Sequence, residues 1–383
     1  MKFQFLIGLL FISFQASAFV SANNFLDDKE SSKRKQKQQA EKDESLKNVV
    51  NEIVASYLNE PGNVGLVIGL LNDTSTAYLS YGLTEVNGTE KPNKNTLFEI
   101  GSLTKPFTAL LALELERKNK LNLNDIITHH LPDSLTNEHL KKITLTNLLL
   151  HTAQLPRKPF NLSLTGGNNN NPYKNYGNQH LLEYLDVFKP IKHKKKQGFK
   201  YSNLGYGVLG LALQNAGNAS YKKLLNQHVI KPLKLNNTFF CVPENKKANL
   251  AKPHSFKGTP TENYTYKSAM EASSGLYSCA EDLMELLKKQ LQNGPANSIA
   301  ASLQKCLEPQ QKTNLKHTYI TYAWNYIDRG KRLPPVYIYN GGTAGYRAYI
   351  AFIEESQTGV VVLSNSANRV DEIAVTLIQL LNQ

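Results

Sequence analysis

The chain has 383 residues, of which 41% are hydrophobic, and its formal net charge is +13. This length predicts one large domain or two smaller ones, and the hydrophobic content is enough for a sizeable core. The positive charge favours anionic partners such as cell-envelope polymers, membranes or nucleic acid. Because the sequence has neither a zinc-finger spacing nor a basic stripe with interleaved aromatic residues, we expect no nucleic-acid binding.

The first residues are typical of a secretory signal. Lys2 is followed by an apolar run over 3–14, which is too short to span a bilayer comfortably, and small residues at 16–18 and 20–22 are candidate cleavage sites. We therefore expect 1–22 to be a signal peptide and the protein to be periplasmic or secreted. An uncleaved membrane anchor is the alternative.

A polar segment separates this signal from the rest of the chain. Residues 27–48 are almost entirely polar, so we expect 23–48 to be a linker or an exposed helical lead-in to one domain over 49–383. Helical spacing follows over 48–58. Two strand-like runs over 63–86 surround an Asn-Asp pair, which predicts a hairpin.

The middle of the chain, from about 120 to 300, is mostly helical in pattern. The segments with helical apolar spacing are 143–152, 204–216 and 280–292. An Asn- and Gly-rich loop over 161–178 favours no packed structure. Lysines cluster over 189–200, which indicates a solvated face or a contact with anionic polymer.

Strand patterns return after about residue 318, in TYITYAWNYI, PPVYIYNGG, YRAYIAFIEE and TGVVVLSNS, and a helix over about 369–382 ends the chain. Strands therefore come from both ends of the domain. The sequence predicts an α+β fold, in which an antiparallel sheet built from both chain ends is flanked by helices and a mostly helical region is inserted between its halves.

The cysteines give little chemical information. An exported protein could pair two of them and leave one, and their spacing fits no metal motif, so we expect structural or incidental roles. The three are Cys241, Cys279 and Cys306. We expect neither a metal nor a cofactor.

Ser102 lies three residues before Lys105, at the start of an apolar helix that we expect to end near Lys118. Residues three apart are neighbours on one helix face, so a neutral lysine could accept the proton of the serine hydroxyl. The same Ser-x-x-Lys spacing occurs at Ser32, Ser220 and Ser302. Context distinguishes Ser102, because it follows a glycine at the positive end of the helix.

Two further segments have a comparable context. Tyr201, Ser202 and Asn203 form a polar turn before another apolar helix. Gly341 and Gly342 lie between two strand-like runs, where a glycine-rich edge lets a substrate approach the backbone closely.

In this order, the segments resemble the serine β-lactamase and penicillin-binding-protein family, and most closely its class C branch and the related DD-carboxypeptidases. NTLFEIGSLTKPFTA is similar to the first motif of that branch and YSN to its Tyr-x-Asn motif. ITLTNLLLHTAQLPR is similar to the helix and loop ahead of the active site, and ASSGLYSCAEDLMEL to the Gly-Leu-Tyr-Ser lead. The resemblance covers about residues 45–382.

The resemblance implies a role for each matching residue. Ser102 would be the nucleophile that forms an acyl-enzyme, and Lys105 and Tyr201 would share the general base and acid work. Asn203 would bind the substrate amide and hold Lys105. The N–H groups of Ser102 and Gly342 would form the oxyanion hole.

The third motif departs from the family pattern. Where the family has Lys or His, then a small residue and Gly, this chain has Tyr339, Asn340 and Gly341. The change removes a cation from the substrate site, so substrates that bear a carboxylate would lose a charge-assisted contact.

The missing cation would also affect the proton-transfer groups. Lys105 and Tyr201 would lose a neighbour that lowers their pKa values, so the pH optimum is expected to be higher. Arg347 and Lys158 are the candidates for supplying the missing charge. We expect structural roles for His151, at a helix end, and Trp324, in the core or sheet.

The predicted function is an exported serine hydrolase that acts on D-alanyl-D-alanine peptides of the cell wall as a carboxypeptidase or endopeptidase, with β-lactam binding or hydrolysis at the same site. We expect a monomer near anionic envelope polymers. The alternatives are an esterase on the same scaffold and a non-catalytic envelope-binding protein.

Overall fold

The computed structural model describes residue 44 and residues 47–168, 171–190 and 198–382. The expected signal peptide and most of the lysine cluster lie outside the described residues. The predicted helix over 48–58 is confirmed, since 47–59 are helical. The compact unit that carries the sheet spans 56–383.

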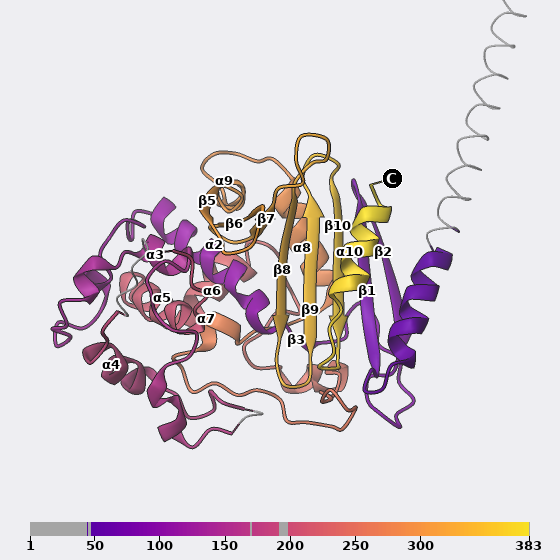
Figure 1. Ribbon diagram of the computed structural model, residues 1–383, viewed down its shortest axis with the longest axis horizontal. Helices are drawn as coiled ribbons and strands as arrows, with labels where there is room; N and C mark the ends of the chain where they lie inside the picture. The colour runs from indigo at the N-terminus through magenta and orange to yellow at the C-terminus, as the bar shows by residue number, and fades with distance from the viewer. Residues whose placement is uncertain (1–43, 45–46, 169–170, 191–197, 383) are drawn as a thin grey trace, which may run out of the picture. The chain divides into compact units, whose positions relative to one another are not determined.

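The described strands of this unit form an eight-stranded antiparallel sheet in the order β2-β1-β10-β9-β8-β7-β6-β5 (Figure 1). The strands are β1 (Gly65–Asn72), β2 (Ser75–Gly82), β5 (Pro309–Lys312), β6 (Thr318–Thr321), β7 (Asn325–Ile327), β8 (Val336–Gly342), β9 (Arg347–Ile353) and β10 (Thr358–Ser364). Because β1 pairs directly with β10, the prediction of one sheet built from both chain ends is confirmed.

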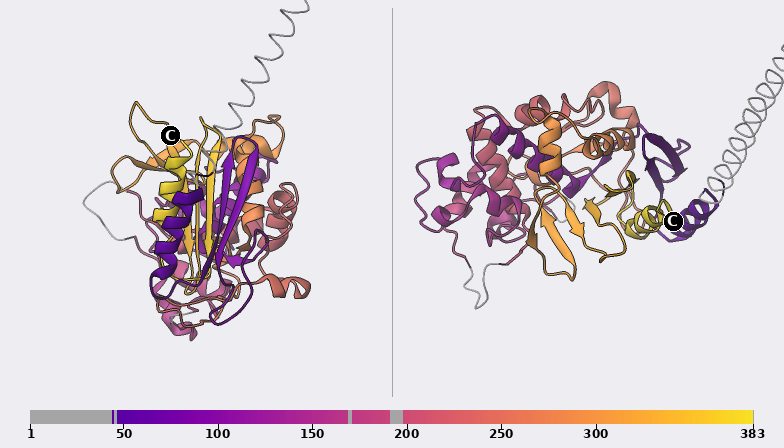
Figure 2. Two further views of the ribbon diagram at one scale, coloured as in Figure 1. Left: turned by 90° about the vertical axis from the view of Figure 1, so that its right-hand side faces the viewer. Right: turned by 90° about the horizontal axis from the view of Figure 1, so that it is seen from above.

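The burial of the strands follows their sequences. β1 and β10 are apolar along almost their whole length and buried on both faces, whereas the edge strand β2 is largely exposed or half-buried. Helix α8 (Ala280–Leu291) packs on β1 and β10, and α10 (Asp371–Leu380) packs on β9 and β10. Figure 2 shows helices on both faces of the sheet, which explains the double-sided burial.

Helices lie between the two halves of the sheet, as the predicted α+β fold requires. Besides α8 they are α2 (Thr104–Arg117), which precedes the predicted insertion at about 120–300, and α3 (Leu145–Leu149), α4 (Asn178–Asp186), α5 (Asn203–Ala216), α6 (Tyr221–Leu225), α7 (Glu271–Ser274) and α9 (Ile299–Lys305). α2 is buried over most of its length and contacts α5, α7 and α9, as expected for a helix that is apolar on most of its sides. No helix among the described residues is long and apolar enough to cross a bilayer.

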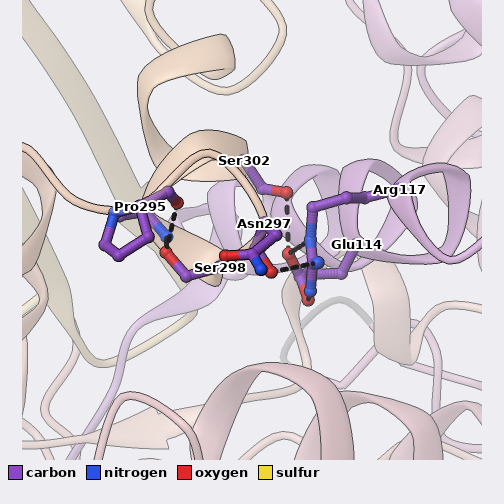
Figure 3. A network of polar contacts seen from close by, with 7 residues as sticks. Glu114, Arg117, Pro295, Asn297, Ser298 and Ser302 are labelled. Carbon is purple, nitrogen blue, oxygen red and sulfur yellow. Dashed lines mark hydrogen bonds and ion pairs between the residues drawn. The ribbon is translucent and has the colours of Figure 1, made fainter.

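A polar network attaches the second half of α2 to α9 (Figure 3). The buried Glu114 accepts two hydrogen bonds from Arg117, at 2.9 and 2.8 Å, and one from Ser302 Oγ at 2.7 Å. Burial alone would raise the pKa of Glu114, but these donors outweigh it and the pKa is lowered. Glu114 is therefore a paired structural carboxylate.

Three features differ from the sequence expectations. The sheet begins at β5, before residue 318, and two very short strands, β3 (Phe98–Glu99) and β4 (Tyr277–Ser278), form a second sheet that no local pattern predicts. The described part of the 161–178 loop is packed, because Tyr176 is fully buried and its hydroxyl donates to Asn161 Oδ1. Tertiary contacts therefore order a segment whose composition favours no packed structure.

All three cysteines are unpaired, and only Cys241 is exposed. Burial raises the pKa of the Cys279 thiol to about 12, so it is protonated at neutral pH. The buried cysteines therefore act as small apolar side chains.

Candidate active site

Most of the sequence-predicted site residues line one cavity of about 680 Å³ at the end of β8. Ser102 and Tyr201 line it together with all four residues of the third-motif segment, which are Tyr339, Asn340, Gly341 and Gly342. The remaining two, Lys105 and Asn203, are buried. The structure therefore brings three distant segments to one place.

Ser102 and Lys105 are adjacent, as the spacing predicts. Ser102 lies in the 3-10 turn Gly101–Leu103, and Lys105 lies in the first turn of α2. The Lys105 Nζ atom is 3.3 Å from Ser102 Oγ, and it also donates to Asn203 Oδ1 at 2.9 Å and to the Ser273 carbonyl at 2.8 Å. These three acceptors hold an amine that is 0% exposed directly beside the serine hydroxyl.

The surroundings shift the pKa values of the two candidate bases. Burial lowers the pKa of Lys105, and the nearby charge of Arg157 lowers it further against the opposing effect of Tyr201. Burial would raise the pKa of Tyr201, but Lys105 and the Ser102 hydroxyl outweigh it and the pKa is lowered. Because both pKa values are lowered, Lys105 and Tyr201 can each lose their own proton, and so accept that of Ser102, at a lower pH than usual. The largest cause of the lowered pKa of Lys105 is burial, and not a cation in the third motif.

The turn that carries Tyr201 is fixed by helix capping. Ser202 is the N-cap of α5, where its Oγ accepts from the Gly205 N–H at 2.8 Å and donates to the Pro156 carbonyl at 2.7 Å. The Asn203 N–H donates to the Arg157 carbonyl at 3.2 Å. Hydrogen bonds from the Ser202 side chain and the Asn203 backbone therefore join the Tyr-Ser-Asn turn to the loop at 156–157.

His151 supports the same turn. Its Nδ1 accepts from the Ser202 N–H at 3.1 Å, and its ring centroid lies 4.5 Å from that of Tyr201. Burial and the nearby Lys105 place the pKa of His151 well below 6.5. A neutral, fully buried imidazole agrees with the structural role expected from the sequence.

The glycines of the third motif allow close backbone approach. A Cβ atom at Gly341 would collide with the Ile100 carbonyl oxygen, and one at Gly101 would lie 2.7 Å from the Gly342 nitrogen. Gly101 also has a φ of +49°, which favours glycine. The backbone beside Ser102 therefore lies against that of Gly342, as a two-amide oxyanion hole requires.

Tyr339 occupies the position of the family cation without replacing its charge. Its hydroxyl is buried next to the side chain of Tyr201. Burial raises the pKa of Tyr339 well above 10, so it is a neutral phenol. Its ring makes an edge contact with Trp324, which is in the core as expected and donates to Gln290.

The two candidates for the missing charge are poorly suited to the role. Lys158 is exposed and is not among the described residues that line the cavity. Arg347 does line it, but its Nη1 donates to the Thr343 and Tyr346 carbonyls at 2.9 and 2.8 Å. The prediction for Lys158 is therefore not supported by its position.

Sequence reasoning missed two cavity arginines, Arg157 and Arg369. Neither lies in a Ser-x-x-Lys, Tyr-x-Asn or glycine-turn segment, although Arg157 is the last residue of the ITLTNLLLHTAQLPR segment. It also missed Ser273, which acts through its backbone carbonyl. Among the described residues, no three His, Cys, Asp or Glu side chains are grouped so that they could hold a metal ion.

Comparison with known proteins supports the resemblance. The family model described as Beta-lactamase matches residues 50–383. A β-lactamase of Yersinia enterocolitica is 24% identical over 361 residues, which cover 83% of this chain and 86% of that protein. A β-lactamase of Pseudomonas fluorescens is 27% identical over 364 residues, which cover 84% and 93%. Protein flp of Staphylococcus aureus is 27% identical over 294 residues, or 74% of this chain and 56% of that protein.

Solved structures share the fold at low identity. A class C β-lactamase superposes with a TM-score of 0.75 at 21% identity, over 88% of this chain and 96% of that chain. A β-lactamase/D-alanine carboxypeptidase of Pseudomonas syringae gives 0.74 at 22% identity, over 88% and 99%. The expected β-lactamase/transpeptidase-like α+β fold is thus confirmed. Because the family model matches most of its length, the chain belongs to the Beta-lactamase family of serine hydrolases.

Proposed function

We propose that this protein is an exported acyl-serine hydrolase that cleaves cell-wall peptides ending in D-alanyl-D-alanine, as a carboxypeptidase or endopeptidase, and that also binds or slowly hydrolyses β-lactams. The observation that carries this proposal is the buried Lys105 Nζ, 3.3 Å from Ser102 Oγ. The solved neighbour named for both β-lactamase and D-alanine carboxypeptidase activity supports the pairing of substrates.

In the acylation step, Ser102 Oγ attacks the carbonyl carbon of the scissile bond while its proton passes to Lys105 or Tyr201. A C–O bond forms, and the carbonyl oxygen becomes an oxyanion beside the N–H groups of Ser102 and Gly342. When this intermediate collapses, the C–N bond breaks and the leaving amine takes the proton from Tyr201 or Lys105. The acyl group remains on Ser102.

In the deacylation step, water attacks the ester carbonyl and gives a proton to the same basic pair. As the bond between Ser102 Oγ and the acyl carbon breaks, the pair passes this proton to Oγ, so the acid is released and the serine hydroxyl is restored. Asn203 holds Lys105 through Oδ1, and its Nδ2 lies 3.2 Å from the Tyr173 hydroxyl. Because the sequence identifies no separate base dedicated to the deacylating water, we favour peptide cleavage over rapid lactam turnover.

Export and envelope contact belong to the same proposal. The signal-like segment at 1–22 and the net charge of +13 support a protein that works outside the cytoplasm beside anionic polymers, and we propose that it does so as a monomer. Fractionation of cells that express the full chain, followed by N-terminal sequencing of the exported protein, tests this part independently of catalysis.

The first test is intact-protein mass after brief exposure to a penicillin, on the wild type and on Ser102→Ala. We expect a penicilloyl-sized gain that is absent in the variant. A slow loss of the adduct supports a penicillin-binding peptidase, and a rapid loss identifies a β-lactamase. Release of D-alanine from a dipeptide-terminated substrate then checks the peptidase activity directly.

Ester hydrolysis is the second candidate, because the neutral Tyr339 favours uncharged acyl donors. An unmodified protein with intact drug, together with Ser102-dependent cleavage of a nitrophenyl ester, would favour it. A protein inactive on all three substrate classes would instead support the non-catalytic binding protein.

A further inference from the structure

The cavity beside Ser102 has an excess of positive charge at its walls. Its described lining includes three arginines and one carboxylate, Asp371. Arg369 is paired with that carboxylate at 3.0 Å. Arg347 is half-buried, and its Nη1 donates to two backbone carbonyls. Arg157 makes neither a hydrogen bond from its side chain nor an ion pair among the described residues.

The position of Arg157 is nevertheless well defined. Its carbonyl accepts from the N–H groups of Asn203 and Leu204 at 3.2 and 3.4 Å, so the loop is attached to the first turn of α5. Its guanidinium carbon lies 5.1 Å from the ring centroid of Tyr201. The side chain is exposed to the cavity, so stacking on Tyr201 leaves its N–H donors open to a ligand.

This arrangement matches the geometry needed to bind a carboxylate. A guanidinium has five N–H donors in a planar fork and can bind both carboxylate oxygens, whereas the neutral phenol of Tyr339 can offer one donor and no charge. The Arg157 side chain is also pre-oriented by a rigid aromatic ring, which reduces the entropy lost on binding.

We propose that Arg157 binds an anionic group of the substrate, a carboxylate in the first instance, and thereby determines the specificity of the Ser102 site for anionic acyl donors. This inference rests on the proposed acyl-serine function and deepens it. Arg157 would supply from the 156–157 loop the charge that the third motif lacks.

The test compares Arg157→Gln with wild type on two peptides, diacetyl-Lys-D-Ala-D-Ala and the same peptide with a C-terminal carboxamide. We expect kcat/KM for the carboxylate peptide to fall about 10- to 100-fold, mainly through KM, because one charge-assisted contact is lost. The carboxamide peptide should change less than about 3-fold. Arg157→Lys should restore part of the preference, and the neighbouring Lys158→Gln should behave as wild type.

An equal loss on both peptides, with a displaced pH–rate profile, would overturn the proposal, because Arg157 would then act through Tyr201 and Lys105. Unchanged kinetics on both peptides would overturn it as well.

Binding measured in a protein that cannot catalyse the reaction distinguishes a failure of the Arg157 proposal from a failure of the proposed function. In a Ser102→Ala background, calorimetry with the two peptides should show a carboxylate preference that Arg157→Gln removes. If the wild type cleaves neither peptide but this preference is present, the peptidase proposal fails and the Arg157 proposal stands. If neither peptide binds the Ser102→Ala protein, the Arg157 proposal is overturned even where a penicillin acylates Ser102.

Discussion

Glu99 is a buried carboxyl that lies three residues before Ser102, in strand β3, and is 3% exposed. Its Oε1 accepts hydrogen bonds from Asn263 Nδ2 at 2.9 Å, the Tyr264 N–H at 2.6 Å and the Tyr277 hydroxyl at 3.2 Å. The side chain of Thr343 also lies beside this carboxyl. Burial raises the pKa of Glu99 from 4.5 to about 7.

This difference makes the stability of the protein depend on pH. A carboxyl whose pKa is higher in the folded chain binds its proton more tightly there, so the free energy of unfolding falls as the pH rises from 4.5 through about 7. A difference of about 2.5 pH units corresponds to about 3 kcal/mol in total. Of this, about 2 kcal/mol is lost between about pH 5.5 and about pH 8.

The perturbation is Glu99→Gln, which keeps the shape and one carbonyl oxygen for the three donors but cannot ionise. Urea unfolding, followed by circular dichroism at about pH 5.5 and about pH 8, gives the free energy of unfolding at each pH. The wild type should lose about 2 kcal/mol more than the variant over this interval. Glu90→Gln, at an exposed glutamate, should retain the wild-type dependence.

Parallel losses in the wild type and Glu99→Gln, within about 0.5 kcal/mol, would refute the reasoning. They would mean that Glu99 is solvated or already ionised in the folded state. Such a result would also concern the cavity, because Tyr264 lines the cavity and its backbone N–H donates to Glu99.

Two further predictions concern the site and its support. Lys105→Arg should slow acylation by a penicillin about 10²- to 10⁴-fold, because arginine does not release its proton, and a wild-type rate would exclude Lys105 as the base. Ser302→Ala should lower the free energy of unfolding by about 1–2 kcal/mol and leave acylation unchanged, because its bond to Glu114 lies in the α2–α9 network (Figure 3). A change in its acylation rate would connect that network to the cavity.

The sequence predicted those structural features that depend only on residues close together in the chain. Alternating and continuous apolar runs predicted the β1–β2 hairpin and the strands β8, β9 and β10, whereas the single run expected over 318–327 is two paired strands, β6 and β7. The turn residue Asp73 has the left-handed φ of 55° that the β1–β2 turn favours. The position of Lys105 beside Ser102 follows from helix geometry alone. The substitution of Tyr339 for the family cation is likewise visible in the sequence.

Only the tertiary structure determines the contacts between residues far apart in the chain. Lys105 meets the Asn203 side chain 98 residues away and the Ser273 carbonyl 168 residues away. The burial that lowers the pKa of Lys105 comes from this packing. The two-residue strands β3 and β4 are also too short to leave a pattern, and they form because they pair with each other.

The sequence by itself determined the order of the motifs, the class of fold and the serine–lysine pair, because the spacing of the motifs, the alternation of apolar residues and the position of Ser102 after a glycine at a helix start are all local features. The tertiary structure decided which arginine is free to bind an anion. Arg157 and Arg347 are the same amino acid beside the same cavity, but Arg157 is exposed and lies over the Tyr201 ring, whereas Arg347 is half-buried and its Nη1 donates to two backbone carbonyls. Hydrogen-bond satisfaction depends on the packing of distant segments, which no local pattern records.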